Sequence, residues 1–511
     1  MSFYQYLKEH AYKDPSHPAI IEGDTCLSYG DFVSQIECFA SALSKFKLNA
    51  NSKIGLLCLN QKEYLVAYFA ALLKGVPVIP FNFMLKPEDL VYITQDAGID
   101  TLIIDSTFVK PEITPFFKFF PNKILIGPAD SDQVGEGTIS WNEFMALGDP
   151  NASLTKHKRG EGLPDVILYT SGTTAKPKGV MLEENQFDAN CTGFLEHLHF
   201  TPEDKVIVAL PLFHSFGNIM ALALLRSGAT LILLKQFQPK TILESIAQHK
   251  ATILPLVPTI YSFLVQLYAR GGYDVSSLRY CISGGASLPE ALLKRVEEGL
   301  GVTVIEGYGL TETSPVIAVN TMKDGSVPAS VGPILPNVEL EIVDEAGKSL
   351  KQGEVGEIRV RGETVMKGYW KKSDATAETL SADGWLKTGD VATMDADGFV
   401  TIVDRVKDML ISGGENVYPA EIENVLLSHE KITDAGVIGI PSAKWGESPL
   451  AVIVRADESI SAEDVMAHCV GKLAPFKTVK AVEFVEEIPR NASGKILKRQ
   501  LREQFNYESS D

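Results

Sequence analysis

The 511-residue chain lacks the features that usually mark secreted, zinc-stabilised or membrane-spanning proteins. Its six cysteines form neither a CxxC pair nor a cluster with histidine, which argues against disulfides and structural zinc and favours a reducing compartment. The N-terminus has no basic segment followed by an apolar one, so no signal peptide is expected. The most apolar stretch, 206–234, is interrupted by Pro211, Asn218 and Arg226, so we expect no transmembrane segment. These absences predict a cytoplasmic protein, with peripheral membrane contact left open.

The chain also has little positive charge. It contains 47 Lys and Arg against 65 Asp and Glu, a net charge of −18. Nucleic-acid-binding proteins usually present a basic face, so we expect no nucleic-acid partner. Any anionic ligand must instead be attracted by a local cationic site. The length predicts two to four domains.

Short apolar runs alternate with helical patterns up to about residue 325, which predicts an α/β fold with mostly parallel strands. The expected strands are 54–59, 101–104, 206–210, 230–234, 252–256 and 302–305, and the expected helices are 63–74, 87–95 and 240–249. Ser287 is expected to cap a further helix that starts with Leu-Pro-Glu290.

The pattern changes at about residue 332. Short strand-like pieces separated by turn signals predict a β-rich subdomain over 332–403. Helix and strand patterns return from Asp408 onward, including helices 420–428 and 462–473. This last portion is long enough for a small α+β domain.

The most informative segment is 169–179, YTSGTTAKPKG, which follows the strand-like run 166–168. Glycines let backbone N–H groups converge, hydroxyls donate hydrogen bonds and lysine adds charge, so this composition predicts a loop that binds phosphate. It is not a Walker A motif, because Val180 follows Lys178 and Gly179 where that motif has Ser or Thr after the lysine. A flexible surface loop is the alternative.

A second polar segment, 306–314, follows the expected strand 302–305. Ligands of open α/β sheets bind at such strand ends. Tyr308 offers a flat face for a base, and a carboxylate such as Glu312 commonly holds Mg²⁺ beside phosphates. The turn 283–286 exposes backbone in a similar way. A glycine-rich turn with a solvated glutamate is the alternative.

Three further segments carry candidate site residues. Asp390 could accept hydrogen bonds from the hydroxyls of a ribose, and Arg405 could donate to the same sugar or to a phosphate, although a surface turn is an alternative. The loop 489–498 places Lys495 in a second Gly/Ser/Lys segment. His214 lies among apolar residues, which favours a core histidine over the gate of a pocket.

Together these segments resemble the ordered core motifs of the adenylate-forming superfamily, which includes acyl-CoA synthetases, firefly luciferase and the adenylation domains of peptide synthetases. The motifs are 170–179, 307–313, 388–390, 404–408 and 491–495, in family order along the whole chain. Segments 211–217 and 412–419 resemble fatty acyl-CoA ligases most closely. Ala175 stands where the family usually has glycine, which predicts a stiffer loop because alanine resists positive φ.

The resemblance implies a large N-terminal domain, 1–403, a hinge at 404–408 that includes Lys407, and a small mobile C-terminal domain, 409–511. It also implies two half-reactions. A carboxylate first attacks the α-phosphorus of ATP and expels pyrophosphate, which gives an acyl-adenylate. The thiol of CoA then attacks the adenylate and releases AMP.

The resemblance also assigns residues to roles. The implied catalytic residues are Lys495, His214, Thr311 and Glu312, with Glu312 holding Mg²⁺. The implied ATP-binding residues are Thr170, Ser171, Gly172, Thr173, Thr174, Lys178, Gly284, Gly285, Ala286, Glu306, Gly307, Tyr308, Gly309, Thr311, Asp390 and Arg405. The thiol arm is expected at Ser412, Gly413, Gly414 and Glu415, and an apolar acyl pocket at Phe213, Phe216, Met220 and Val257.

These assignments predict a fatty acyl-CoA synthetase for medium- to long-chain acids, acting as a monomer or homodimer. The phosphopantetheine of an acyl carrier protein remains an alternative acceptor, since it presents the same thiol arm as CoA. A luciferase-like oxygenase and a non-catalytic nucleotide-binding protein are less favoured. The presence of Lys178, Glu312, Asp390, Arg405 and Lys495 argues against a protein that has lost its activity.

Overall fold

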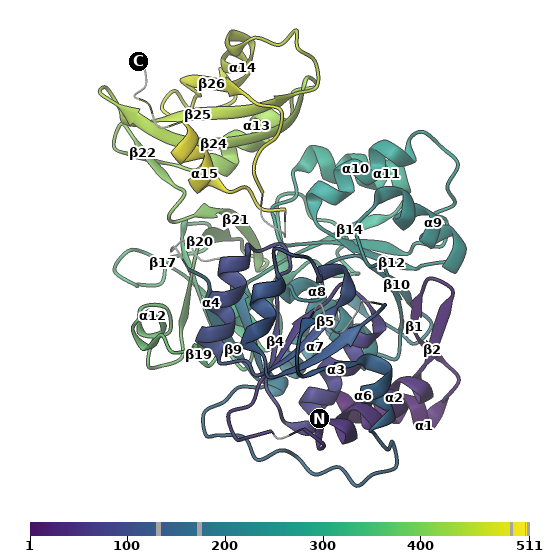
Figure 1. Cartoon of the computed structure of the whole chain (residues 1–511). Coiled ribbons are helices and arrows are strands. Elements are labelled where there is room, and N and C mark those ends of the chain that lie inside the picture. The colour runs from purple at the N-terminus through teal and green to yellow at the C-terminus, as the bar shows by residue number, and fades with distance from the viewer. Residues whose placement is uncertain (47, 129–133, 171–175, 491–493, 506, 508–511) are drawn as a thin grey trace.

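The computed structural model describes residues 1–511 apart from 47, 129–133, 171–175, 491–493, 506 and 508–511. The strands of the described part form four sheets (Figure 1). Two of them are large and mainly parallel, which confirms the predicted α/β class. The other two are mainly antiparallel and lie toward the C-terminal end of the chain.

The first large sheet has the order β15-β14-β13-β12-β10-β11-β1-β2. Its inner strands run parallel, and the antiparallel strands β2 and β15 lie at its two edges. The strands are β1 (Pro18–Glu22), β2 (Thr25–Ser28), β10 (Lys205–Val208), β11 (Thr230–Leu233), β12 (Ile253–Leu256), β13 (Tyr280–Ser283), β14 (Thr303–Gly309) and β15 (Val316–Val319).

The second large sheet has the order β19-β9-β8-β4-β3-β5-β6-β7. Strands β8, β4, β3, β5, β6 and β7 are parallel neighbours, and β9 and β19 continue the sheet antiparallel. The strands are β3 (Ile54–Leu57), β4 (Val78–Pro80), β5 (Thr101–Asp105), β6 (Asn122–Ile126), β7 (Thr138–Ser140), β8 (Val166–Thr170), β9 (Lys178–Leu182) and β19 (Gly368–Tyr369).

Helices cover both faces of these two sheets. The central layer joins the sheets through one large apolar core, and consists of α2 (Tyr29–Leu43), α3 (Lys62–Lys74), α7 (Glu184–Leu198) and α8 (Ser215–Arg226). Outer layers are formed by α9 (Pro239–His249), α10 (Pro258–Tyr268) and α11 (Glu290–Leu300) on the first sheet, and by α4 (Pro87–Ala97) on the second. In β10, Val206 and Val208 join the central core while Ile207 faces the outer one, as the strand period requires.

The third sheet is antiparallel, with the order β16-β21-β20-β18-β17. Its strands are β16 (Gly332–Pro333), β17 (Val338–Val343), β18 (Gly356–Gly362), β20 (Leu386–Met394) and β21 (Phe399–Arg405). The fourth sheet comprises β22 (Leu410–Ser412), β23 (Glu415–Val417), β24 (Ile432–Ser442), β25 (Gly446–Arg455) and β26 (Ala481–Phe484). Strand β21 includes the first two residues of the predicted hinge, so the hinge segment begins inside a strand.

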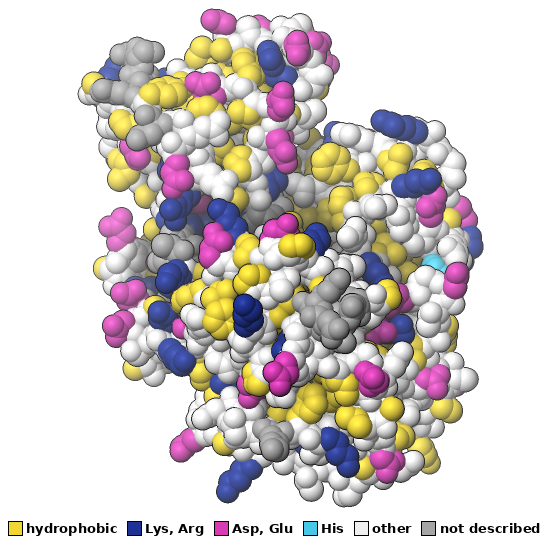
Figure 2. Space-filling view, in the orientation of Figure 1, with side chains coloured by type: hydrophobic (Ala, Val, Ile, Leu, Met, Phe, Trp, Pro, Cys, Tyr) yellow, Lys and Arg dark blue, Asp and Glu magenta, His cyan; other side chains and the backbone are white. Residues whose placement is uncertain are grey.

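The fourth sheet and three helices form a separate lobe, the C-terminal lobe, at the top of Figure 1. These helices are α13 (Pro419–Leu427), α14 (Ala462–Cys469) and α15 (Lys498–Gln504). Within the described residues, the remaining helices are α1 (Phe3–Lys13), α6 (Trp141–Ala146) and α12 (Ser373–Thr379), with short 3-10 turns at Ser106–Phe108, Thr114–Phe119 and Thr311–Thr313. Figure 2 shows the surface hollowed between this lobe and the part that carries α10 and α11.

Some local predictions were wrong. Ser287 does not cap α11, which begins at Glu290 with Pro289 at the N-cap position. The amide of Leu288 donates to the Glu306 side chain of the neighbouring strand at 3.0 Å. Strand β14 extends beyond residue 305 to Gly309, because its last residues pair with the antiparallel β15. The helix predicted over 462–473 ends at Cys469.

All six cysteines are unpaired in the structure, in agreement with the prediction of no disulfides. Of the helices in the described part of the chain, none has both the length and the apolar character needed to cross a bilayer.

The outer core of the first sheet gives a prediction on stability. Leu254 on β12 is fully buried against this core, so Leu254→Ala should leave a cavity and lower the free energy of unfolding by about 2–5 kcal/mol. Leu147→Ala is the matched control, because Leu147 is 44% exposed. The two variants are compared by the midpoint of thermal unfolding. An equal midpoint for both variants would contradict the burial of Leu254.

Candidate active site

The candidate site is built around the carboxyl ends of the parallel strands β12, β13 and β14. Strands β13 and β14 pair so that Ser283 lies opposite Glu306. The next residue, Gly284, packs tightly, since a Cβ there would lie 3.3 Å from the Phe216 ring and 3.4 Å from the Gly307 carbonyl oxygen. The structure thus brings three separately predicted segments into contact at one edge of the sheet.

Asp390 joins two of the predicted nucleotide motifs. Its carboxylate accepts hydrogen bonds from the Tyr308 hydroxyl and from Arg405 Nε, each at 2.6 Å. Asp390 and Arg405 are direct partners on β20 and β21, and Asp390 is only 5% exposed. Burial, and next the Asp390 charge, raise the pKa of Tyr308 well above its usual value. The phenol therefore keeps its proton and acts as a donor.

Lys495 of the C-terminal lobe is buried and interacts electrostatically with Arg405 and Asp390 of the same cluster. Burial, followed by the nearby charge of Arg405, lowers its pKa to about 8, while Asp390 opposes this shift. The preceding Gly494 packs on the start of α10, where a Cβ would lie 2.7 Å from Thr259 Oγ1. Arg490 donates to the Gly494 carbonyl at 2.6 Å and fastens this part of the loop. The loop residues 491–493 lie outside the described residues.

Glu312 lies in the short turn Thr311–Thr313 after β14. Its Oε1 accepts a hydrogen bond from the Tyr369 hydroxyl at 2.8 Å, and its carbonyl accepts from the amide of Met366 at 2.8 Å. The neighbouring Thr311 donates to Ser215 Oγ at 3.2 Å, which links the turn to the start of α8. Tyr369 was not predicted as a site residue, and no spacing in the sequence points to its contact with Glu312.

The predicted phosphate loop is described only at its two ends. Thr170 closes β8, Lys178 opens β9, and these two residues pair across the antiparallel strands. Lys178 Nζ lies 5.0 Å from the centre of the Tyr369 ring. The predictions for Ser171, Gly172, Thr173, Thr174 and Ala175 lie outside the described residues.

Two titratable groups at the site are shifted by burial. His214 precedes α8 and caps this helix, because its Nδ1 accepts a hydrogen bond from the amide of Phe216 at 3.3 Å. Burial lowers the His214 pKa to about 4, so the ring is neutral near pH 7. Burial raises the pKa of Glu306 to about 8, against the hydrogen bond from the Leu288 amide. Through its hydrogen bond with the Leu288 amide, Glu306 links the segment after Ala286 to β14.

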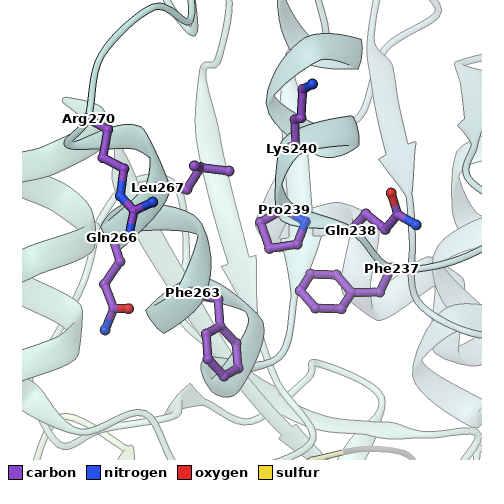
Figure 3. A pocket seen from close by; sticks show the side chains of 8 residues that line it. All are labelled: Phe237, Gln238, Pro239, Lys240, Phe263, Gln266, Leu267 and Arg270. Atoms are coloured by element: carbon purple, nitrogen blue, oxygen red, sulfur yellow. The ribbon is translucent and has the colours of Figure 1, made fainter. Parts of the chain in front are cut away.

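The residues predicted to form the acyl pocket are mostly buried. Phe213, Met220 and Val257 lie in the interior, and the Phe213 ring meets the Phe83 ring edge to face at 5.0 Å. The cavity drawn in Figure 3 lies elsewhere, between the start of α9 and the outer side of α10. It is lined by Phe237, Gln238, Pro239, Lys240, Phe263, Gln266, Leu267 and Arg270.

The predicted thiol-arm residues form the hairpin of β22 and β23, where Ser412 pairs with Glu415. Gly413 donates to the Trp445 carbonyl at 2.8 Å, and a Cβ at Gly413 would lie 2.9 Å from the Trp445 ring. This hairpin therefore packs within the C-terminal lobe, and the described contacts do not join it to the Asp390 cluster. At the predicted hinge, burial and then the charge of Arg405 lower the pKa of Lys407.

Comparison with known families identifies both parts of the chain. The model of the AMP-binding enzyme family matches residues 7–370, and the model of the AMP-binding enzyme C-terminal domain matches residues 421–495. The feruloyl-CoA synthase of Amycolatopsis sp is 34% identical, with 96% of each chain covered. The long-chain-fatty-acid–CoA ligase of Bacillus subtilis (strain 168) is 33% identical, over 98% of this chain and 93% of the relative.

Solved structures give the same result. ATP-bound MatB from Rhodopseudomonas palustris is similar with a TM-score of 0.87 and 31% identity, with 99% of each chain covered. The anthranilate CoA ligase AuaEII in complex with anthranoyl-AMP gives a TM-score of 0.91 and 27% identity, over 99% of this chain and 97% of that one. With well over half of its length matched by the family model, the chain belongs to the AMP-binding enzyme family.

Proposed function

We propose that the protein is an AMP-forming ligase that activates a medium- to long-chain fatty acid with ATP and transfers the acyl group to CoA. The observation that supports this most directly is that Lys495 is buried and interacts electrostatically with Arg405 and Asp390. A cation from the C-terminal lobe thereby joins the residues proposed to hold the ribose. Such a cation would suit a reaction that brings a carboxylate and ATP together.

The first half-reaction brings two anions together. An oxygen of the carboxylate forms a bond to the α-phosphorus as the bond to pyrophosphate breaks, and negative charge accumulates between them. We propose that the Lys495 ammonium lies between carboxylate and α-phosphate and offsets this charge. Asp390, already oriented by Tyr308 and Arg405, would accept hydrogen bonds from the ribose hydroxyls. Thr170 and Lys178 would contact the terminal phosphates from the two ends of their loop.

The site fits Mg²⁺ bound jointly by the protein and the nucleotide. Mg²⁺ is usually held by one or two carboxylates together with substrate phosphates. The described residues contain no group of three or more His, Cys, Asp or Glu that could form a complete protein cage. The oriented carboxylate of Glu312 would instead hold the ion with the triphosphate. Bound there, Mg²⁺ would neutralise phosphate charge.

The choice of a fatty acid rests on the apolar character of the proposed acyl region. Phe213, Met220 and Val257 are buried and carry no charge that would select a polar acid. A relative that is 33% identical is a long-chain-fatty-acid–CoA ligase, whereas another is a feruloyl-CoA synthase. An aromatic acid is therefore the competing substrate class, and a carrier-protein thiol is the competing acceptor.

We propose that the second half-reaction uses a different arrangement of domains 1–403 and 409–511. The hairpin 412–415 contacts Trp445 of its own lobe in the present arrangement. Rotation about 404–408 would withdraw Lys495 and present this hairpin to the thiol arm. Asp404 accepts from the Ala420 amide at 2.8 Å, so one hydrogen bond across the hinge would have to break.

The substrate assignment is tested by carboxylate-dependent exchange of pyrophosphate into ATP. We expect exchange with saturated acids of medium to long chain. With a phenylpropenoic acid, kcat/KM should be at least about tenfold lower than with these acids, since a few lost methylene contacts carry such a factor. Thioester formation is then measured with CoA and with a holo carrier protein. Faster exchange with the aromatic acid would overturn the fatty acid, and exclusive use of the carrier would overturn CoA.

Lys495→Ala tests the division of labour between the two half-reactions. Removal of the ammonium should lower the rate of exchange by about 10²–10³-fold, in line with the loss of one preorganised charge stabiliser. Thioester formation from supplied acyl-adenylate should stay within about twofold of the unsubstituted protein. Lys472→Ala, at an exposed lysine of the same lobe, is the control. Equal loss of both half-reactions would contradict the proposed role.

The lowered pKa of Lys495 gives a pH dependence. Lys495 is charged below its pKa of about 8 and loses its proton above that value. Because kcat/KM reports the free enzyme, its value for exchange should fall as the pH rises through about 8. In Lys495→Arg the group stays charged, and this fall should disappear even if the rate is lower. The same decline in both proteins would exclude Lys495 as its source.

A further inference from the structure

Tyr369 lies between two charged side chains of the proposed ATP site. Its hydroxyl donates to Glu312 Oε1 at 2.8 Å, and its ring centre lies 5.0 Å from Lys178 Nζ. The side chain belongs to the buried core and is only 7% exposed. One rigid ring therefore contacts both the proposed metal-binding carboxylate and the proposed phosphate-binding ammonium.

The backbone fixes Tyr369 to both neighbours. It pairs with Val180 on β9, two residues after Lys178, and its amide donates to Thr376 Oγ1 at 2.9 Å. Three residues earlier, the amide of Met366 donates to the carbonyl of Glu312 at 2.8 Å. The segment that carries Tyr369 is therefore attached by main-chain hydrogen bonds to the strand of Lys178 and to the turn of Glu312.

Lys178 and Glu312 are both part-buried, and opposite charges attract each other more strongly where water is partly excluded. Among the ion pairs of the described residues, none joins Lys178 to Glu312. Tyr369 instead offers the carboxylate a hydroxyl donor and the ammonium the negative face of an aromatic ring. Each charge thus has a partner of its own. If the two charges paired directly, that pair would have to break before a triphosphate could enter.

We propose that Tyr369 is a positioning residue that holds the Glu312 carboxylate through its hydroxyl and the Lys178 ammonium through its ring face, so that a magnesium-bearing triphosphate fits between them. The inference rests on the proposed function only in requiring that ATP binds with Mg²⁺ at this place. Neither the acid nor the thiol enters it. Tyr369 itself takes no part in bond making or breaking.

The test is calorimetric titration with ATP, in excess Mg²⁺ and again in excess EDTA. Tyr369→Phe keeps the ring beneath Lys178 but removes the donor to Glu312, so it should weaken ATP binding about tenfold in Mg²⁺ and less than about twofold in EDTA. Tyr369→Leu removes both contacts and should weaken binding under both conditions. In a Glu312→Gln background, Tyr369→Phe should have no further effect, because the two residues act as a pair.

Tyr29→Phe is the matched control. The Tyr29 hydroxyl is also buried and donates to the Ala229 carbonyl at 2.8 Å. Tyr29 is on α2, which contacts β1 and β2 at the edge of the first sheet opposite to β14 and β15. This variant should bind ATP like the unsubstituted protein under both conditions. The proposal is overturned if Tyr369→Phe weakens binding equally with and without Mg²⁺, if it changes neither, or if Mg²⁺ does not strengthen ATP binding to the unsubstituted protein. Failure of every fatty acid in the exchange assay would instead overturn the proposed substrate and leave this result standing.

Discussion

The buried carboxylate of Asp390 is the point on which the arrangement of the site depends. It accepts from Tyr308 at the end of β14 and from Arg405 on β21, so it joins the first parallel sheet to the antiparallel third sheet. A buried charge is costly unless it is paired and hydrogen-bonded, and these two donors meet that requirement. Lys495 of the C-terminal lobe interacts electrostatically with the same group. One small cluster of charge therefore involves residues from three parts of the chain.

Close packing at the strand ends gives the polar groups their places. A Cβ at Gly309 would overlap the Pro315 carbonyl oxygen, and one at Gly284 would press on the Phe216 ring. Glycine at these positions lets the turn 311–313 fold back and bring Glu312 beside Tyr369. The ring of Tyr369 in turn contacts Lys178 on the second sheet. The close approach of the backbone thus determines where the charged side chains lie.

Much of the fold was open to prediction, because apolar periodicity reports burial directly. The expected strand 230–234 and helix 87–95 correspond closely to β11 and α4. The prediction that Ser287 caps a helix was wrong, since α11 begins at Glu290, and the nearby Leu288 amide donates to Glu306 on a neighbouring strand. Strand β14 extends past its expected end because its last residues are strand only through their pairing with β15. Local signals cannot register partners that are far away in the chain.

The sequence by itself determined the α/β class, the family resemblance and the kinds of side chain available for nucleotide chemistry. These follow from the order of residues and from short motifs within single segments. Only the tertiary structure decided which motifs meet: that Asp390 holds Tyr308 and Arg405, and that Tyr369 lies between Glu312 and Lys178. The physical reason is that hydrogen bonds and charge interactions act over a few ångströms of space. Residues separated by tens or hundreds of positions come within that range only when the sheets and the C-terminal lobe have packed.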